Sequence, residues 1–258
     1  MHYYELYFRI KHIFRDVIRS SYPVDWDEDF ITRTILSRLR RDLGRVEISG
    51  AKDKIVLNWM PFKLTGLAET YFGDIAIIVY NRYRDGDEIS GVAFLEAKKR
   101  DPRKTSFKAL NITQLKRIYK NAPHSQVLYY DYEDVTEYSH SINRDEHFLP
   151  YFGKERFPYV TECTHSIAAP MQNIIETKLK DTSAYKFGLP FSYQLCFRYF
   201  QSFDLDLDKR SFDIARGYAK SRRFPKFVLL IVVSHGDEDQ HVSENQIVNT
   251  ELYQALED

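Results

Sequence analysis

The chain has 258 residues, of which 43% are hydrophobic and 29% are charged. This composition supplies enough apolar surface for a folded core and excludes a disordered, highly charged tail. The 37 Lys and Arg residues balance the 37 Asp and Glu residues, so any attraction to a polyanion has to come from local clusters of charge.

The cysteines and the N-terminal segment bear on location in the cell. Cys163 and Cys196 stand far apart in no CxxC or Cys/His spacing, so the sequence predicts neither a disulfide framework nor a zinc site. Charges interrupt the first residues every few positions, unlike a signal peptide, and no apolar run approaches the roughly 18 residues of a membrane span. We expect a cytoplasmic protein without a membrane partner.

In the first half of the chain, two amphipathic helices precede a group of strands. Helical spacing of apolar residues covers 3–18 and about 27–43. The predicted elements that follow are a strand at 46–49 or 55–59, strands at 74–81 and 91–98, a helix at 106–121 and a strand at 127–132. An Asp-Gly pair between the strands at 74–81 and 91–98 indicates that these two form an antiparallel hairpin.

The second half begins with a polar, poorly periodic segment at 133–165, which we interpret as an irregular insertion. The later predicted elements are helices near 168–180, 190–203 and 211–220 and a strand at 227–233. This last run, FVLLIVV, needs burial on both faces, so we expect it to rejoin the main sheet. The prediction is one domain over residues 1–258, in which 166–258 form an integrated α/β extension.

Three ionisable residues are predicted to meet at one end of the sheet. Strand alternation puts Glu96 and Lys98 of the motif FLEAKKR on one face, and the hairpin brings Asp74 opposite them. Two carboxylates beside the Ala97 carbonyl suit Mg²⁺, and a neighbouring lysine can orient or activate a water. The alternative for a Glu-x-Lys motif alone is an ordinary ion pair at a sheet edge, because such short motifs are common by chance.

The ordered set of motifs resembles the PD-(D/E)xK nuclease superfamily over about residues 25–135. It consists of Gly73-Asp74 before a strand, a hairpin, Glu96-Ala97-Lys98 and then a helix with the motif QLKRIY, which contains Gln114. Gly73 stands where that family commonly has proline. The resemblance implies a restriction-endonuclease-like α/β core with a central mixed β-sheet flanked by helices, and a helical C-terminal extension.

The same resemblance implies a metal-dependent endonuclease that uses Mg²⁺, for which Mn²⁺ can substitute. Asp74, Glu96 and the Ala97 carbonyl would bind the metal, Lys98 would orient or activate the water, and Gln114 would position Lys98 or a substrate phosphate. The family often adds an acid from its first core helix. Glu28 is the expected source of this acid, because it shares a helical face with Ile31 and Ile35.

Two alternatives to that role for Glu28 stay open. Glu69 is a rival source of the extra carboxylate, from the segment before Asp74. Acidic residues at a helix N-terminus also serve capping and the helix dipole without any catalytic role.

A basic group near the proposed site is expected to neutralise nucleic-acid phosphates without reading sequence. Its members are Lys99, Arg100, Arg103, Lys104, Lys116, Arg117 and Lys120. We expect DNA as substrate. The chain resembles effector nucleases of bacterial anti-phage defence, including the Lamassu kind, in which a partner ATPase controls cutting.

The competing hypothesis is a catalytically inactive subunit that keeps the nuclease fold for nucleic-acid binding or assembly. Repulsion between two neighbouring carboxylates argues against it, because a scaffold gains nothing from that pairing. The sequence leaves open DNA or RNA, the preferred cut site, the identity of a regulatory partner and whether the chain forms a homo-oligomer.

Overall fold

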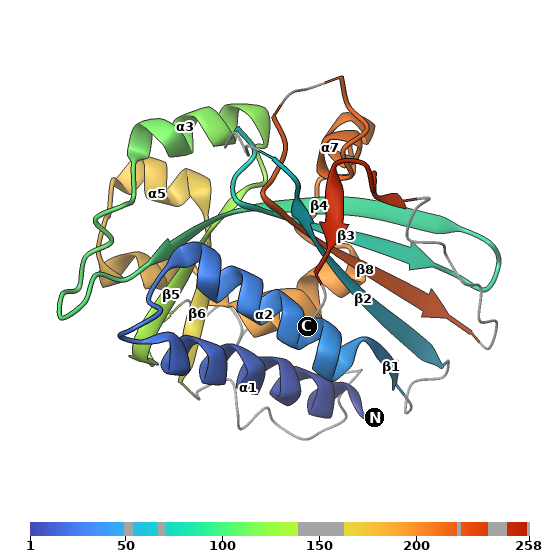
Figure 1. Ribbon diagram of the computed structural model, residues 1–258, viewed down its shortest axis with the longest axis horizontal. Helices are drawn as coiled ribbons and strands as arrows, with labels where there is room; N and C mark the ends of the chain where they lie inside the picture. The colour runs from blue at the N-terminus through green and yellow to red at the C-terminus, as the bar shows by residue number, and fades with distance from the viewer. Residues whose placement is uncertain (49–53, 67–70, 139–162, 221–222, 237–246, 257–258) are drawn as a thin grey trace.

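The protein is an α/β structure in which helices cover both faces of a large mixed β-sheet (Figure 1). The predicted class is therefore confirmed at this level. The computed structural model describes residues 1–48, 54–66, 71–138, 163–220, 223–236 and 247–256.

The sheet contains nine strands within these described residues, in the order β1-β2-β8-β3-β4-β5-β6-β7, with β9 paired to β2. The strands are β1 (Arg45–Ile48), β2 (Ile55–Leu64), β3 (Ile75–Arg82), β4 (Glu88–Lys99), β5 (Gln126–Val135), β6 (Thr164–Pro170), β7 (Leu189–Pro190), β8 (Phe227–His235) and β9 (Tyr253–Ala255). As predicted, β3 and β4 form an antiparallel hairpin. Both early strand candidates are strands, β1 and β2.

Strand β8 occupies the middle of the sheet, antiparallel to β2 and parallel to β3. Its first seven residues are all buried. The prediction that this apolar run rejoins the main sheet is confirmed, and the reason is the expected one: residues apolar on both faces need cover from helices on both sides.

The longer helices are α1 (Tyr3–Ser21), α2 (Glu28–Leu43), α3 (Ile112–Asn121), α5 (Met171–Thr177) and α7 (Lys209–Ala215). The shorter turns are η3 (Thr182–Phe187), α6 (Phe191–Tyr193), η4 (Gln194–Arg198) and η5 (Tyr199–Gln201). Helices α1 and α2 lie side by side on one face, where they share a core with the inward side of β4 (Figure 1). Helices α3 and α5 pack together on the other face beside β5, and α7 covers that face further along.

Four predicted helices differ from the observed ones. Helix α3 starts at Ile112 rather than 106, because the Asn111 side chain caps it. Residues 168–170 belong to β6, so α5 starts only at Met171. The helix predicted at 190–203 is divided into an α turn, a π turn and a 3₁₀ turn. The one predicted at 211–220 spans Lys209–Ala215.

The predicted irregular insertion falls largely on residues 139–162, which lie outside the described residues. At its two ends the prediction was wrong, because residues 133–135 continue β5 and residues 164–165 begin β6.

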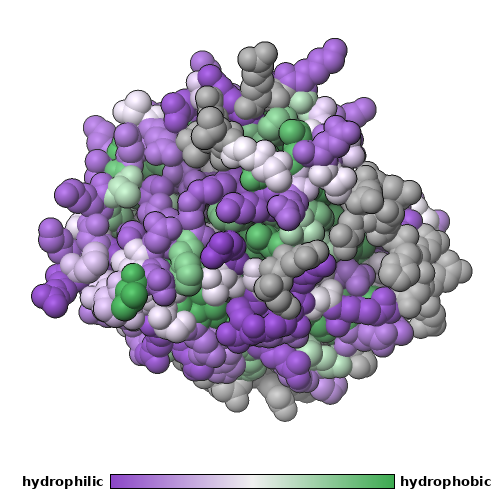
Figure 2. Space-filling view, viewed as in Figure 1, coloured by the Kyte–Doolittle hydropathy of each residue, from purple (hydrophilic) through white to green (hydrophobic). Residues whose placement is uncertain are grey.

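Hydrophilic residues predominate on the side of the molecule seen in Figure 2, and the hydrophobic ones show only in small separate groups. Among the described residues, every helix is too short or too polar to cross a membrane.

Candidate functional site

Asp74 lies at the open end of the β3–β4 hairpin, away from its turn. The Asp74 N–H donates to the Leu95 carbonyl at 2.8 Å, and the Asp74 carboxylate accepts a hydrogen bond from the Ala97 N–H at 3.0 Å. The Phe227 N–H of β8 donates to the Asp74 carbonyl. The predicted juxtaposition of Asp74 with the end of β4 is therefore present, and the backbone of three strands fixes it.

Glu96 lies beside Asp74 with only 1% of its surface exposed. Its Oε1 accepts hydrogen bonds from the Lys98 ammonium at 2.7 Å and from the Gln114 amide at 2.8 Å. Within the described part of the chain, its Oε2 is buried without a hydrogen-bond partner. A buried carboxylate oxygen without a donor is costly, so this atom would be stabilised either by a proton on the neighbouring Asp74 or by a bound cation.

Lys98 is buried between acidic groups on both sides. Its ammonium donates to Glu96, to the Ala97 carbonyl at 2.7 Å, and to Glu28 Oε2 at 3.4 Å. The other Glu28 oxygen accepts from the Lys99 N–H at 3.1 Å. Glu28 therefore reaches the site through the Lys98 ammonium and the Lys99 backbone.

Burial and mutual repulsion change the protonation of these groups. Burial, followed by repulsion from Glu96, raises the pKa of Asp74 to about 8. Burial also raises the pKa of Glu96, although Lys98 opposes the shift. Burial lowers the pKa of Lys98, but attraction from Glu96, Glu28 and Asp74 outweighs it and leaves the pKa above its ordinary value. The pair of carboxylates thus tends to hold a proton while Lys98 stays charged.

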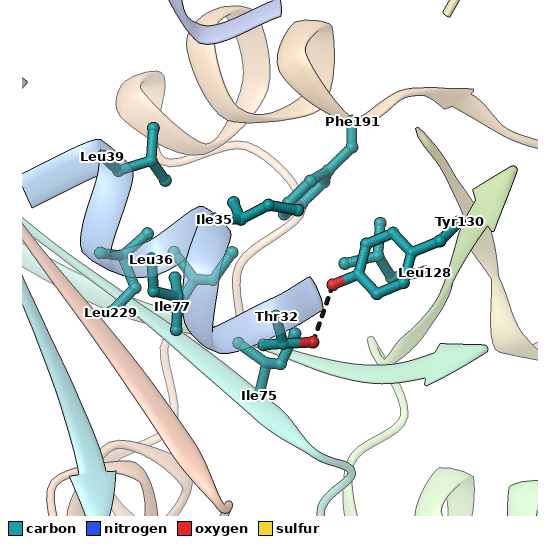
Figure 3. A pocket seen from close by; sticks show the side chains of 10 residues that line it. All are labelled: Thr32, Ile35, Leu36, Leu39, Ile75, Ile77, Leu128, Tyr130, Phe191 and Leu229. Atoms are coloured by element: carbon teal, nitrogen blue, oxygen red, sulfur yellow. Dashed lines mark hydrogen bonds between the residues drawn. The ribbon is translucent and has the colours of Figure 1, made fainter. Parts of the chain in front are cut away.

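The first turn of α2 is anchored to the ends of β4 and β5. The Trp26 indole donates to the Arg100 carbonyl at 2.7 Å, and the Thr32 and Tyr130 hydroxyls are 3.0 Å apart (Figure 3). Glu28 and Thr32 are four residues apart and share a face of the helix. These anchors explain how Glu28 is held beside Lys98. No sequence pattern predicts this role of Trp26.

The cavity next to the Thr32–Tyr130 bond is no ligand site. It has a volume of about 10 Å³ and is lined mostly by apolar side chains, among them Ile35 and Phe191 (Figure 3). A space of this size and character is a packing gap between α2 and the sheet.

Gln114 contacts Glu96. Its amide donates to Glu96 Oε1 at 2.8 Å, the oxygen that also accepts from Lys98. The Asn111 cap starts α3 at Ile112 and places Gln114 in its first turn. The predicted role of Gln114, positioning Lys98 or a substrate phosphate, stays a prediction.

Arg100 does not belong to the predicted nucleic-acid surface. It is 9% exposed, and its guanidinium pairs with Asp131 at 3.0 Å and Glu133 at 2.6 Å. Breaking those pairs to reach a phosphate would leave buried Asp131 uncompensated. Lys99 is half-buried and its ammonium bonds the Trp26 carbonyl.

The other predicted basic residues are exposed: Arg103, Lys104, Lys116, Arg117 and Lys120. Their role in binding stays a prediction. The rival carboxylate Glu69 lies outside the described residues.

The donor set fits a magnesium ion better than a transition metal. Among the described residues, no three His, Cys, Asp or Glu side chains form a metal-ligating group. Mg²⁺, however, usually takes only one or two carboxylates and completes its shell with waters and phosphate oxygens. Asp74 and Glu96, with an unpartnered Oε2, satisfy that requirement. The Ala97 carbonyl accepts from Lys98 with one of its two lone pairs, and its role as a metal ligand stays a prediction.

Comparison of this chain with protein-family models, with curated proteins and with solved structures finds no match. The site therefore has to be judged by its own geometry.

Proposed function

We propose that the chain is a Mg²⁺-dependent endonuclease of the PD-(D/E)xK type that hydrolyses phosphodiester bonds, with DNA as its expected substrate. The observation that carries the proposal is the buried pair of carboxylates, Asp74 and Glu96, in which Glu96 Oε2 has no partner among the described residues and Lys98 lies 2.7 Å from Oε1. A cation would relieve both the repulsion and the unsatisfied oxygen.

Each residue of the proposed site would have its own role. Asp74 and Glu96 would hold Mg²⁺, which when bound supplies Lewis-acid polarisation of the phosphate and a lowered pKa for water. Lys98, charged because its pKa is raised, would orient the attacking water by hydrogen bonding and stabilise negative charge on the phosphate. It would not act as a base. Gln114 fixes Glu96 and Glu28 fixes Lys98.

The rival proposal is an inactive nuclease-fold subunit for binding or assembly. In a scaffold the Asp74–Glu96 pair would serve no purpose, and replacing it with neutral groups would stabilise the fold. Metal binding separates the two proposals.

The decisive experiment uses wild type, Glu96→Gln and Glu88→Gln. Glu88 lies exposed on the same strand and pairs with Arg82, so it is the matched control. Calorimetry with Mg²⁺ or Mn²⁺ should show binding for wild type and Glu88→Gln but not for Glu96→Gln. Cleavage of plasmid, linear DNA and RNA should be unchanged in Glu88→Gln and should fall by more than about 100-fold in Glu96→Gln. Even replacing a residue that only orients a metal ligand lowers affinity or activity by about 10–100-fold.

Undiminished cleavage by Glu96→Gln would remove Glu96 from the site. Absence of metal binding by wild type would favour the scaffold.

We further propose, from the sequence resemblance alone, that this activity serves bacterial anti-phage defence under the control of a partner ATPase. Cleavage that is silent with the purified chain and appears on addition of that partner would support this regulation.

A further inference from the structure

Two arginines from distant parts of the chain lie against one tyrosine ring. The Arg223 guanidinium carbon is 3.5 Å from the Tyr71 ring centroid, and that of Arg117 is 4.8 Å from it. Arg223 comes from the segment before β8 and Arg117 from α3. Sequence patterns could not predict this convergence, since only Arg117 belonged to the basic group recognised there.

The cluster Tyr71–Arg117–Arg223 adjoins the proposed active site on each of its three segments. Tyr71 precedes Asp74 by three residues, and Arg117 follows Gln114 by three residues, on the same side of α3. Arg223 precedes Phe227 by four residues, and the Phe227 N–H binds the Asp74 carbonyl. The three residues are therefore close in sequence to Asp74, to Gln114, whose side chain binds Glu96, and to Phe227, whose N–H binds the Asp74 carbonyl.

The chemistry of the cluster suits a phosphate. A guanidinium that lies on an aromatic ring keeps its N–H donors at its edge, where they match the oxygens of a phosphate in a two-pronged contact. Tyr71 is half-buried and packs against an apolar cluster that includes Phe72, so the ring is a firm platform. Two cations gathered on one platform attract an anion more strongly than either one alone.

We propose that Tyr71, Arg117 and Arg223 bind a backbone phosphate of the nucleic acid next to the phosphate that is cut, and so align the strand with Asp74 and Glu96. This inference rests on the proposed function for its substrate class. The contacts would be to phosphate rather than to base edges, so they would add affinity without sequence preference.

Binding of a short fluorescein-labelled DNA duplex, measured in EDTA over a range of salt, tests the site independently of cleavage. Arg117→Ala and Arg223→Ala should each weaken binding about tenfold, as expected for a charge-assisted contact. Each should also reduce the slope of log affinity against log salt by about one. Tyr71→Leu, which keeps apolar bulk but removes the ring, should weaken binding as well.

Arg216→Ala is the matched control, because Arg216 also lies on two rings, Phe212 and Tyr218, but follows α7, which carries no residue of the proposed active site. Its affinity and salt slope should equal those of wild type. Arg223→Lys keeps the charge but loses the planar guanidinium group. Its affinity for the duplex should lie between those of wild type and Arg223→Ala. Thermal melts of every variant separate a binding loss from unfolding.

Unchanged binding by folded Arg117→Ala and Arg223→Ala would overturn the inference, as would an equal loss in Arg216→Ala. If wild type binds no metal and cuts nothing, yet the two arginine variants still lose DNA binding, the proposed nuclease activity fails and the phosphate site stands. Displacement of the duplex by inorganic phosphate, beyond that by chloride of equal ionic strength, would identify a free phosphate compound as the ligand and overturn the assignment to nucleic acid.

Discussion

Gly73 passes so close to Leu95 that a Cβ built on Gly73 would lie 2.5 Å from the Leu95 carbonyl oxygen. Its φ of +85° belongs to the region that side chains disfavour. The same carbonyl accepts the Asp74 N–H. Glycine at this position therefore lets the chain turn tightly into the site.

Gly73→Ala should lower the free energy of unfolding by more than about 1 kcal/mol, since both the strained φ and the contact with a backbone oxygen oppose a side chain. Gly73→Pro should be worse, because proline fixes φ near −65°. Urea denaturation measures both changes.

Gly86→Ala is the control for the backbone conformation alone, because Gly86 has a φ of +88° with no atom within 4 Å of its would-be Cβ. Equal destabilisation at Gly73 and Gly86 would show that the contact with Leu95 costs nothing.

Gln114→Leu should weaken Mg²⁺ binding by about 10–100-fold, as is typical for residues that orient a metal ligand. The physical reason is that Glu96 Oε1 loses one of its two donors and can rotate away. Calorimetry measures the affinity. Gln172→Leu is the control, because Gln172 makes its side-chain bonds on the exposed surface, to Tyr119 and Glu176. Wild-type affinity in Gln114→Leu would remove Gln114 from the site.

The pH dependence of stability should report on Asp74. Its pKa is raised from 3.8 to about 8 in the folded chain, so the folded state holds a proton that the unfolded state has released. Stability in EDTA should therefore fall as pH rises from about 4 to about 8. Asp74→Asn should show a smaller fall, measured as the free energy of unfolding at several pH values.

Mg²⁺ should stabilise wild type more at the upper end of that pH range, because the cation competes with the proton for the carboxylates. Asp16→Asn, on the exposed side of α1, should behave like wild type. A wild-type profile that is flat or rises over this range would contradict the raised pKa of Asp74.

Truncation after residue 165 should give unfolded or aggregated protein. It removes β8 from between β2 and β3, which exposes the edges of both strands, and it removes α5, α7 and the turns at 191–201 that help to cover the sheet. Each buried side chain lost is worth about 1.5–3 kcal/mol, against about 5–15 kcal/mol for a whole domain. A fragment that melts cooperatively and cuts DNA with Mg²⁺ would show instead that residues 166–258 are a separable control module.

The sequence predicted the elements whose patterns are local and strong. The β3–β4 hairpin follows from alternation and a turn signal, and the meeting of Asp74, Glu96 and Lys98 follows from the hairpin. Strand β6 could not be predicted, because its residues resemble the start of the next helix and pair with β5 across a long separation.

Contacts between distant segments decided the parts of the site that the sequence missed. Arg100 lay in a basic run, yet acids on β5 bury it. Trp26 anchors α2 through a backbone carbonyl that no pattern identifies. Arg223 reaches Tyr71 only because β8 returns to the middle of the sheet.

That return of β8 also sets the time at which the site can form during synthesis. Residue 75 pairs with residue 227, so β3 stays without one neighbour until the ribosome has released β8. The Asp74 carbonyl lacks its partner from Phe227 for the same period. The hairpin of β3 and β4 can bring Asp74 to Glu96 earlier, but the backbone support of Asp74 is complete only once β8 has been made.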